Sequence, residues 1–151
     1  MLQLFFVEDI ANPNLVGDNA HHAERVLRMS VGEDILVSDG RGAWARCSIA
    51  NLGKKVVEVK VIESGVEAVA KSEISVLQAI PKGDRAKETV ELLTAAGVTD
   101  IYPWQSARAI GKESDKWQVA AIEASKQSRR FYIPTVAPKF DTASAIEIFK
   151  D

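Results

Sequence analysis

The chain has 151 residues, of which 46% are hydrophobic and 26% charged, and its formal net charge is −2. This composition is typical of an ordinary soluble globular protein. The net charge excludes a uniformly basic coat for nucleic acid but leaves room for a local basic patch. Cys47 is the only cysteine, which excludes an intrachain disulfide and favours a reducing compartment. Because no apolar run is long enough to span a bilayer and the stretch MLQLFFVEDI is typical of a strand rather than a signal peptide, we expect a cytoplasmic protein.

The first 70 residues combine one helix with several short strands. Asp18 or Asn19 is expected to cap a helix that carries HHAERVLRM and ends at Gly32. Alternating apolar residues then predict strands at 35–37, 44–49 and 56–62, and Asp39-Gly40-Arg41-Gly42 is expected to form a tight turn. With an N-terminal strand, this pattern predicts a small β-barrel-like domain over residues 1–70. The small and polar stretch 64–73 is expected to be the linker.

A basic edge runs along the predicted helix. His22 and Arg25 lie three residues apart, and Arg28 follows three residues later. Basic side chains along one helix edge can follow the phosphates of a nucleic-acid backbone, but a solvated helix edge explains the same pattern equally well. The pair His21-His22 does not predict a metal site, because neighbouring helical residues point about 100° apart and no Cys/His cluster occurs elsewhere.

Residues 71–151 alternate between strands and helices. Strands are predicted at 74–80, 98–102 and 131–136, and helices at 85–96, 116–130 and 143–150, the first capped by Asp84 and the last by Asp141 or Thr142. The nearly continuous apolar run 74–80 indicates a strand buried on both faces. This order predicts parallel strands, so the fold class is α+β in the first part and α/β in the second. The alternation stops after the last helix, and we therefore expect the chain to be the front part of a longer protein.

Polar residues flank the apolar face of the helix predicted at 116–130. Glu123, Gln127 and Arg130 lie at helical spacing beside that face. One interpretation is a core helix with a favourable basic end, and the other makes these three residues part of a polar site. Arg108 follows a predicted strand end, where ligands bind in open α/β sheets. Its alternative role is a salt bridge to Glu123.

The sequence Lys82-Gly83-Asp84-Arg85 connects a predicted strand to a helix, a position where anions often bind. It is not a Walker loop, because the long glycine spacing and the Lys-Ser/Thr pair are missing. No GxGxxG motif occurs, and no Ser/His/Asp arrangement is indicated by a strand–elbow context. The residues by themselves therefore predict a two-domain protein with two basic edges and no particular reaction.

Four motifs occur in the order HHAERVLRMSVGEDILVSDGRG, IPKGDR, GVTDIYPWQSAR and EASKQSRRFYIPTV. In their order and spacing they resemble the RsmE family, the bacterial 16S ribosomal RNA (uracil-N3) methyltransferases, over essentially the whole chain. The resemblance implies a PUA-like RNA-binding domain over residues 1–70 and the N-terminal part of a SPOUT-class methyltransferase domain over residues 71–151. It also implies S-adenosylmethionine as the methyl donor, 16S ribosomal RNA of the small subunit as the substrate and a homodimer as the working form.

The resemblance also implies roles for individual residues. Arg108 and Arg130 are expected to hold phosphate or uracil oxygens, Glu123 to orient one of them or help remove the proton, and Gln127 to read an amide edge. RNA-binding roles fall to six basic residues, His22, Arg25, Arg28, Lys82, Arg85 and Arg129. The family's cofactor site lies in a C-terminal knot with glycine-rich loops, and this sequence has no such loop after Lys139. Cofactor binding and catalysis are therefore not expected of the chain alone, and no metal is expected.

Two other functions fit the same residues. One is a non-catalytic RNA-binding module that keeps the PUA-like part, and the other is a structural role for the α/β half, such as a dimerisation unit. A glycine-rich continuation of the reading frame past Asp151 would distinguish the enzyme from the binding module.

Overall fold

The computed structural model describes residues 1–111 and 114–150. They form two compact units. The first unit comprises Met1–Val69 together with Arg129–Phe131, and the second comprises Ala70–Ser128 together with the chain from Tyr132 onward. Each unit has its own sheet and its own hydrophobic core.

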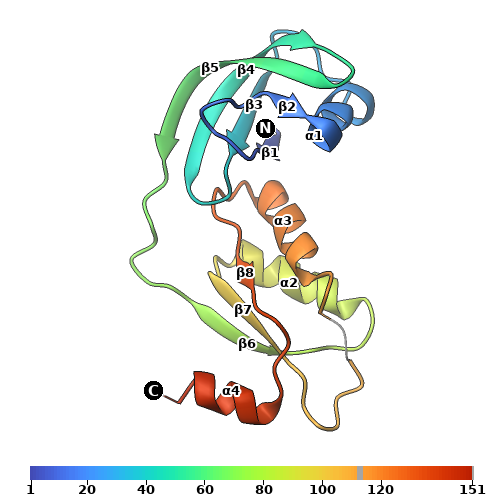
Figure 1. Cartoon of the computed structure of the whole chain (residues 1–151), viewed down its shortest axis with the longest axis vertical. Helices are drawn as coiled ribbons and strands as arrows, with labels where there is room; N and C mark the ends of the chain where they lie inside the picture. Colours follow the sequence, from blue (N-terminus) through green and yellow to red (C-terminus); the bar gives the residue numbers. More distant parts are fainter. Residues whose placement is uncertain (112–113, 151) are drawn as a thin grey trace. The chain divides into compact units, whose positions relative to one another are not determined.

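The first unit is built on a five-stranded sheet with the order β1-β3-β4-β5-β2, whose strands curve into half of a barrel (Figure 1). In chain order its elements are β1 (Leu4–Phe6), β2 (Leu15–Val16), α1 (Gly17–His21), the π-helical turn η1 (His22–Val26), β3 (Asp34–Ser38), β4 (Ala43–Leu52) and β5 (Val56–Val66). β1 and β3 pair in parallel, and the other neighbours are antiparallel. Because β5 continues to Val66, opposite Ala43, the predicted linker begins too early at residue 64.

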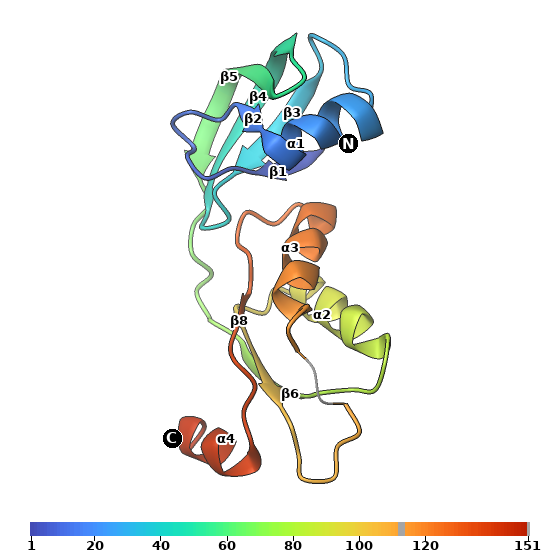
Figure 2. The same ribbon diagram turned by 45° about the vertical axis from the view of Figure 1, so that its right-hand side comes forward.

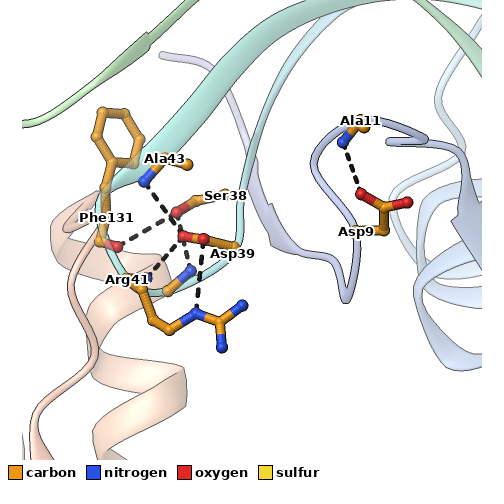
Figure 3. Close-up of polar contacts among 8 residues, drawn as sticks. Asp9, Ala11, Ser38, Asp39, Arg41, Ala43 and Phe131 are labelled. Carbon is orange, nitrogen blue, oxygen red and sulfur yellow. Dashed lines mark hydrogen bonds and ion pairs between the residues drawn. The ribbon is translucent and has the colours of Figure 1, made fainter.

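The turn between β3 and β4 forms where the sequence predicted it. One carboxylate oxygen of Asp39 accepts hydrogen bonds from the backbone N–H groups of Arg41, at 2.7 Å, and Ala43, at 3.2 Å (Figure 3). Gly40 and Gly42 have φ angles of 73° and 102°, a region that L side chains rarely occupy. The turn therefore follows from its local sequence, and it sets the register in which β3 pairs with β4.

The core of the first unit includes alternate residues of β3 and β4, together with residues of β1, β2, β5 and the helical segment. Ile35 and Val37 on β3 and Ala45, Cys47 and Ile49 on β4 are each at most 1% exposed. Burying an Ile or Val side chain stabilises a fold by roughly 2 kcal/mol. The β3–β4 hairpin is therefore the centre of this unit, and the edge strands are added to it.

The predicted cap and end of the first helix are wrong. The N-cap residue is Val16, which makes no side-chain cap bond, and Asp18 lies in the first turn. The side-chain amide of Asn19 instead donates a hydrogen bond of 2.7 Å to the carbonyl of Phe6. Regular structure ends at Val26 rather than at Gly32, because the last turn widens into a π-helix. Val26, the last residue of this π-helical turn, is 59% exposed although its side chain is apolar.

The tripeptide Arg129–Phe131 completes the first unit. The N–H of Gly42 donates to the carbonyl of Phe131 at 2.9 Å, and the Phe131 ring stacks on Trp44 with centroids 5.6 Å apart. The hydroxyl of Ser38 also donates to the Phe131 carbonyl, at 3.3 Å (Figure 3). The strand predicted at 131–136 is therefore wrong in its first half, because Phe131 is bound to the β3–β4 hairpin, and pairing in the second unit is limited to β8 (Thr135–Val136).

The second unit has a three-stranded parallel sheet in the order β6-β7-β8, as the alternation of strands and helices predicted (Figure 2). In chain order its elements are β6 (Ser75–Ala79), α2 (Arg85–Ala95), β7 (Asp100–Trp104), α3 (Trp117–Ser128), β8 and α4 (Thr142–Ile148). The register pairs Val76 with Ile101, and Ile101 with Val136. These three residues belong to a core that α2 and α3 cover.

The two faces of this sheet are covered unequally. Val90 on α2 and Trp117 and Ala121 on α3 are buried against one face. On the other face Tyr102 packs edge-on against Phe149 at the end of α4, with centroids 5.1 Å apart. The prediction that the strand at 74–80 is buried on both faces is wrong, because alternate residues of β6 remain exposed, Leu77 by 37%. The continuous apolar run therefore predicted the strand correctly, but it did not predict that residues on the second face of the strand remain exposed.

Candidate functional site

The first group of candidate residues lies on α1, η1 and the turn that follows. His22 is exposed and packs edge-on against Phe5, with ring centroids 6.3 Å apart. The Arg25 side chain is 58% exposed, and its Nε lies 3.6 Å from a carboxylate oxygen of Glu24. Arg28 is also exposed. The structure thus places three predicted RNA-binding residues on one short surface segment, residues 22–28.

Arg28 occupies an unusual backbone conformation. Its φ is 52°, in the left-handed region, which costs an L residue roughly 1–2 kcal/mol. Packing maintains this conformation, because the N–H of Met29 donates to the carbonyl of Ala23 at 3.0 Å and the Met29 side chain packs on the core. The same contacts leave the Arg28 side chain at the surface. Strained backbone conformations cluster at active sites and ligand-binding segments, so this residue is a candidate for a functional contact.

The second group of candidate residues belongs to the second unit, and its members lie on α3 and in the segment after β7 rather than on one short segment. Glu123 on α3 forms an ion pair with Lys126, with 2.9 Å between the carboxylate oxygen and Nζ. Arg108 is exposed in the segment that follows β7. In the described part of the chain, the alternative salt bridge between Arg108 and Glu123 is not formed. Gln127 is exposed in the last turn of α3.

The expectation that Arg129 and Arg130 lie in the last turn of the helix is wrong, because α3 ends at Ser128 and both arginines belong to the first unit. Arg129 has a φ of 52°, and its Nε donates to the carbonyl of Leu2 at 3.0 Å. Both arginines are half-buried. At least part of the Arg129 guanidinium therefore holds the N-terminal segment, a role that the sequence did not indicate.

A cavity of about 850 Å³ lies in the second unit beside the start of α2 and the start of α3. Lys82 and Glu123, which the sequence assigned to different roles, both line it, whereas Arg85 does not. The sequence interpretation missed three other charged wall residues, Lys87, Asp115 and Lys116, and took Asp84 only as a helix cap. The signal that points to them is their position at a helix start beyond the carboxyl end of a parallel strand.

Two groups have perturbed acidity. Burial, with a smaller contribution from the charge of Asp34, raises the pKa of the Cys47 thiol. Hydrogen bonds from Ser144, first from its backbone N–H, lower the pKa of Asp141.

Within residues 1–111 and 114–150 there is no group of three or more His, Cys, Asp or Glu side chains arranged to hold a metal ion. The described helices include none that is long and apolar enough to cross a membrane.

Two family models match this chain in consecutive segments. The RNA methyltransferase PUA domain matches residues 15–62, and the RNA methyltransferase domain matches residues 69–151, more than half of the chain. The chain belongs to the RNA methyltransferase family. The resemblance drawn from the four sequence motifs is thereby confirmed, and so is the predicted combination of a PUA-like part with a methyltransferase part.

Three similar proteins share one name. Ribosomal RNA small subunit methyltransferase E of Mycobacterium bovis is 31% identical over 156 residues, covering 95% of this chain and 60% of the relative. The Bacillus subtilis protein of that name is 28% identical over 139 residues, covering 86% and 54%. A crystal structure of the Neisseria gonorrhoeae protein of that name, bound to S-adenosyl methionine, matches with a TM-score of 0.83 at 25% identity, covering 97% of this chain and 66% of that one. The chain spans no more than about 60% of these curated relatives.

Proposed function

We propose that this chain supplies the RNA-binding and substrate-positioning part of an S-adenosylmethionine-dependent enzyme that methylates N3 of a uridine in 16S ribosomal RNA. The observation that carries the proposal is the pair of family matches, which place a PUA domain and a methyltransferase domain in this order on one chain. The names of the relatives supply the substrate class, and the bound ligand of the Neisseria structure supplies the methyl donor. The small ribosomal subunit as target, the cytoplasm as location and a homodimer as working form belong to the same proposal.

Residues 22–28 are the proposed contact with the RNA backbone. His22, Arg25 and Arg28 are all exposed there, and Arg28 is held in place by the backbone around it. A protein with a net charge of −2 needs such a local concentration of cations to bind a polyanion. Lys82, Arg85 and Arg129 are the other candidates for phosphate contacts.

The chemistry requires stabilisation of a uracil anion. The N3–H of uracil is weakly acidic, so N3 becomes a good nucleophile only after its proton has left. Guanidinium groups stabilise the resulting charge on the uracil oxygens, because they are always ionised and present a fork of donors. We assign this role to Arg108 and Arg130. Glu123 then orients a guanidinium or assists proton removal, and Gln127 contacts an amide edge.

S-adenosylmethionine supplies the methyl group in this proposal. The described residues after Lys139 contain no glycine, so they do not form the glycine-rich loops expected around the cofactor. The roles assigned to this chain therefore lie on the RNA side of the reaction. Calorimetric titration of the 151-residue chain with S-adenosylmethionine tests this division, and we expect no heat of binding.

The decisive experiment measures methylation by the complete gene product. Small ribosomal subunits that lack the modification are incubated with the enzyme and isotopically labelled S-adenosylmethionine, and N3-methyluridine is quantified by mass spectrometry. We expect Arg108→Ala and Arg130→Ala each to lower the rate by about two orders of magnitude. Arg41→Ala, which removes an exposed arginine from a hairpin turn, is the matched control. Unchanged rates in both test variants would refute the assignments, and the absence of N3-methyluridine with the unaltered enzyme would refute the proposed reaction.

A further inference from the structure

The cavity of about 850 Å³ in the second unit has the size and position of a ligand site. Its wall is built by the loop 81–84 after β6, by the segment after β7 and by the first turns of α2 and α3. In open α/β sheets, ligands bind beyond the carboxyl ends of the strands, in cavities of roughly 300–1,000 Å³. Packing fixes one side of the wall, because a Cβ atom on Gly111 would lie 2.4 Å from the carbonyl oxygens of both Ile80 and Pro81.

Four charged residues of this wall are without an ion-pair partner in the described part of the chain. They are Lys82, Asp84, Asp115 and Lys116. The remaining charged wall residues are paired, Lys87 with Glu91 at 3.7 Å and Glu123 with Lys126 at 2.9 Å. The cavity therefore presents two available cations and two available carboxylates, which cancel in net charge.

Asp84 has a carboxylate that its helix does not use. It occupies the N-cap position of α2, where an aspartate normally accepts a hydrogen bond from a backbone N–H in the first turn. Here its backbone is already helical, with φ −67° and ψ −13°, and its side chain makes no cap bond. A carboxylate in this position can accept hydrogen bonds from a ligand without loss of a contact in the fold.

Apolar side chains complete the wall. Ile110 and Val119 are 72% and 59% exposed, and both line the cavity. Trp117 also lines it and is only 3% exposed. A ligand that fits this wall has an apolar surface, hydrogen-bond donors for the carboxylates and a negative group for the lysines. A simple anion leaves the carboxylates unmatched, and an apolar molecule leaves all four charges unmatched.

We propose that this cavity binds one unpaired nucleotide of the RNA substrate. The base lies between the apolar side chains, its N–H edge donates to Asp84 or Asp115, and its phosphate contacts Lys82 and Lys116. Proteins that read single-stranded RNA hold splayed-out bases in this manner, with apolar contacts to the faces and hydrogen bonds to the edges. The inference rests on the proposed RNA substrate but not on the methylation reaction.

The indole N–H groups of the three tryptophans give a direct test. The Trp117 N–H has no hydrogen-bond acceptor among the described residues, so its NMR signal reports on changes at the cavity wall. The Trp104 N–H donates to Thr142 at 3.1 Å, and Trp44 stacks on Phe131 in the first unit, so these two signals serve as internal controls. Each signal is assigned with a single Trp→Phe variant.

The ¹⁵N-labelled chain is titrated with each of the four ribonucleoside 5′-monophosphates at millimolar concentration. We expect at least one of them to shift the Trp117 signal while the Trp44 and Trp104 signals stay in place. Inorganic phosphate alone is expected to leave all three unchanged. No shift with any of the four nucleotides would overturn the proposal, and a shift of equal size with phosphate alone would also overturn it in favour of a simple anion site.

Matched double variants distinguish nucleotide binding in the cavity from binding by general electrostatic attraction. Lys82→Ala with Lys116→Ala is expected to weaken nucleotide binding roughly tenfold, through the loss of two charge-assisted contacts. Lys71→Ala with Lys150→Ala removes the same charge from exposed positions outside the wall and is expected to leave the affinity unchanged. If both double variants weaken nucleotide binding equally, binding depends on net charge, and the cavity is not the nucleotide site.

The outcome is independent of the methylation assay. If a nucleotide shifts the Trp117 signal but the complete enzyme is inactive, the proposed nucleotide site is supported and the proposed reaction is refuted. If N3-methyluridine forms but no nucleotide shifts the Trp117 signal, the reaction is supported and the nucleotide site is refuted.

Discussion

Arg28 and Arg129 share a backbone conformation that most side chains avoid. Each has a φ of 52°, and they are the only residues other than glycine with a positive φ among those the structure describes. In Arg129 the side chain contributes to the fold, because its Nε donates to the Leu2 carbonyl. Arg28 is exposed, and no described hydrogen bond or ion pair involves its side chain. The effect of an Arg28 substitution on folding can therefore be separated from its effect on RNA binding.

Replacement of Arg28 by glycine tests this separation. Relief of left-handed strain is worth roughly 1–2 kcal/mol, and the added entropy of the unfolded chain opposes it by about 0.5–1 kcal/mol. We expect Arg28→Gly to raise the free energy of unfolding by up to about 1.5 kcal/mol, measured by urea denaturation, while RNA binding weakens. Arg25→Gly removes the same charge from helical backbone and is expected to destabilise the fold by about 1 kcal/mol. Destabilisation by Arg28→Gly would show that the arginine is required for the fold itself.

Cys47 provides a pH-dependent contribution to stability. Burial in β4, where the residue is 0% exposed, raises the pKa of its thiol. The folded state therefore retains the proton while the unfolded thiol ionises near pH 8.5. The stabilisation is fully present below that pH and is lost as the pH rises toward the raised value of the folded state. Urea midpoints measured from neutral to alkaline pH should fall more steeply for the native chain than for Cys47→Ala, and identical slopes would contradict this account.

At the scale of elements, the sequence was most informative where local contacts decide the structure. The Asp39–Gly42 turn and the Asp141 cap depend on side chains only a few residues away, and both were predicted. The π-helical turn was not, because it depends on how Ala23 and Met29 pack on distant strands. The strand at 131–136 was predicted too long for the same reason, since Phe131 binds the β3–β4 hairpin and only Thr135–Val136 forms β8.

The cap of α4 carries a second pH dependence. The Asp141 carboxylate accepts a hydrogen bond of 2.8 Å from the N–H of Ser144, and this bond lowers the pKa of Asp141. Stabilisation of α4 is therefore present above the unfolded carboxyl pKa of about 3.9 and is lost as the pH falls through the lowered folded value. Amide exchange at Ser144 and Ala145, followed by NMR, should accelerate over that acidic range relative to the intrinsic rate.

Two variants distinguish the cap bond from the charge. Asp141→Ala removes the acceptor and should accelerate exchange in α4 at every pH. Asp141→Asn keeps a good N-cap acceptor without an ionisable group, so protection should persist and its acid dependence should disappear. An acid dependence retained in Asp141→Asn would assign the titration to another carboxylate.

At the scale of the whole molecule, the candidate residues divide according to how they are brought together. His22, Arg25 and Arg28 are close in sequence, so a helical pattern was sufficient to group them. Lys82 and Glu123 are on separate elements, and only the packing of α2 against α3 places both on one cavity wall. Sequence patterns identified these residues by type, but the shared wall is a product of tertiary structure.

The chain carries a net charge of −2, so its affinity for RNA must depend on where cations lie and not on their total number. Three phosphate contacts to single-stranded RNA predict a slope of about −2 when log affinity is plotted against log salt concentration. We expect Arg25→Glu with Arg28→Glu to weaken binding of a 16S ribosomal RNA fragment and to bring this slope closer to zero. Filter binding at several salt concentrations measures both the affinity and the slope.

The double variant Lys71→Glu with Lys150→Glu is the control, because it changes the net charge by the same amount at exposed positions outside residues 22–28. It should lower the affinity less and preserve the slope. If the two pairs behave alike, binding follows the net charge of the molecule, and residues 22–28 are not the contact surface.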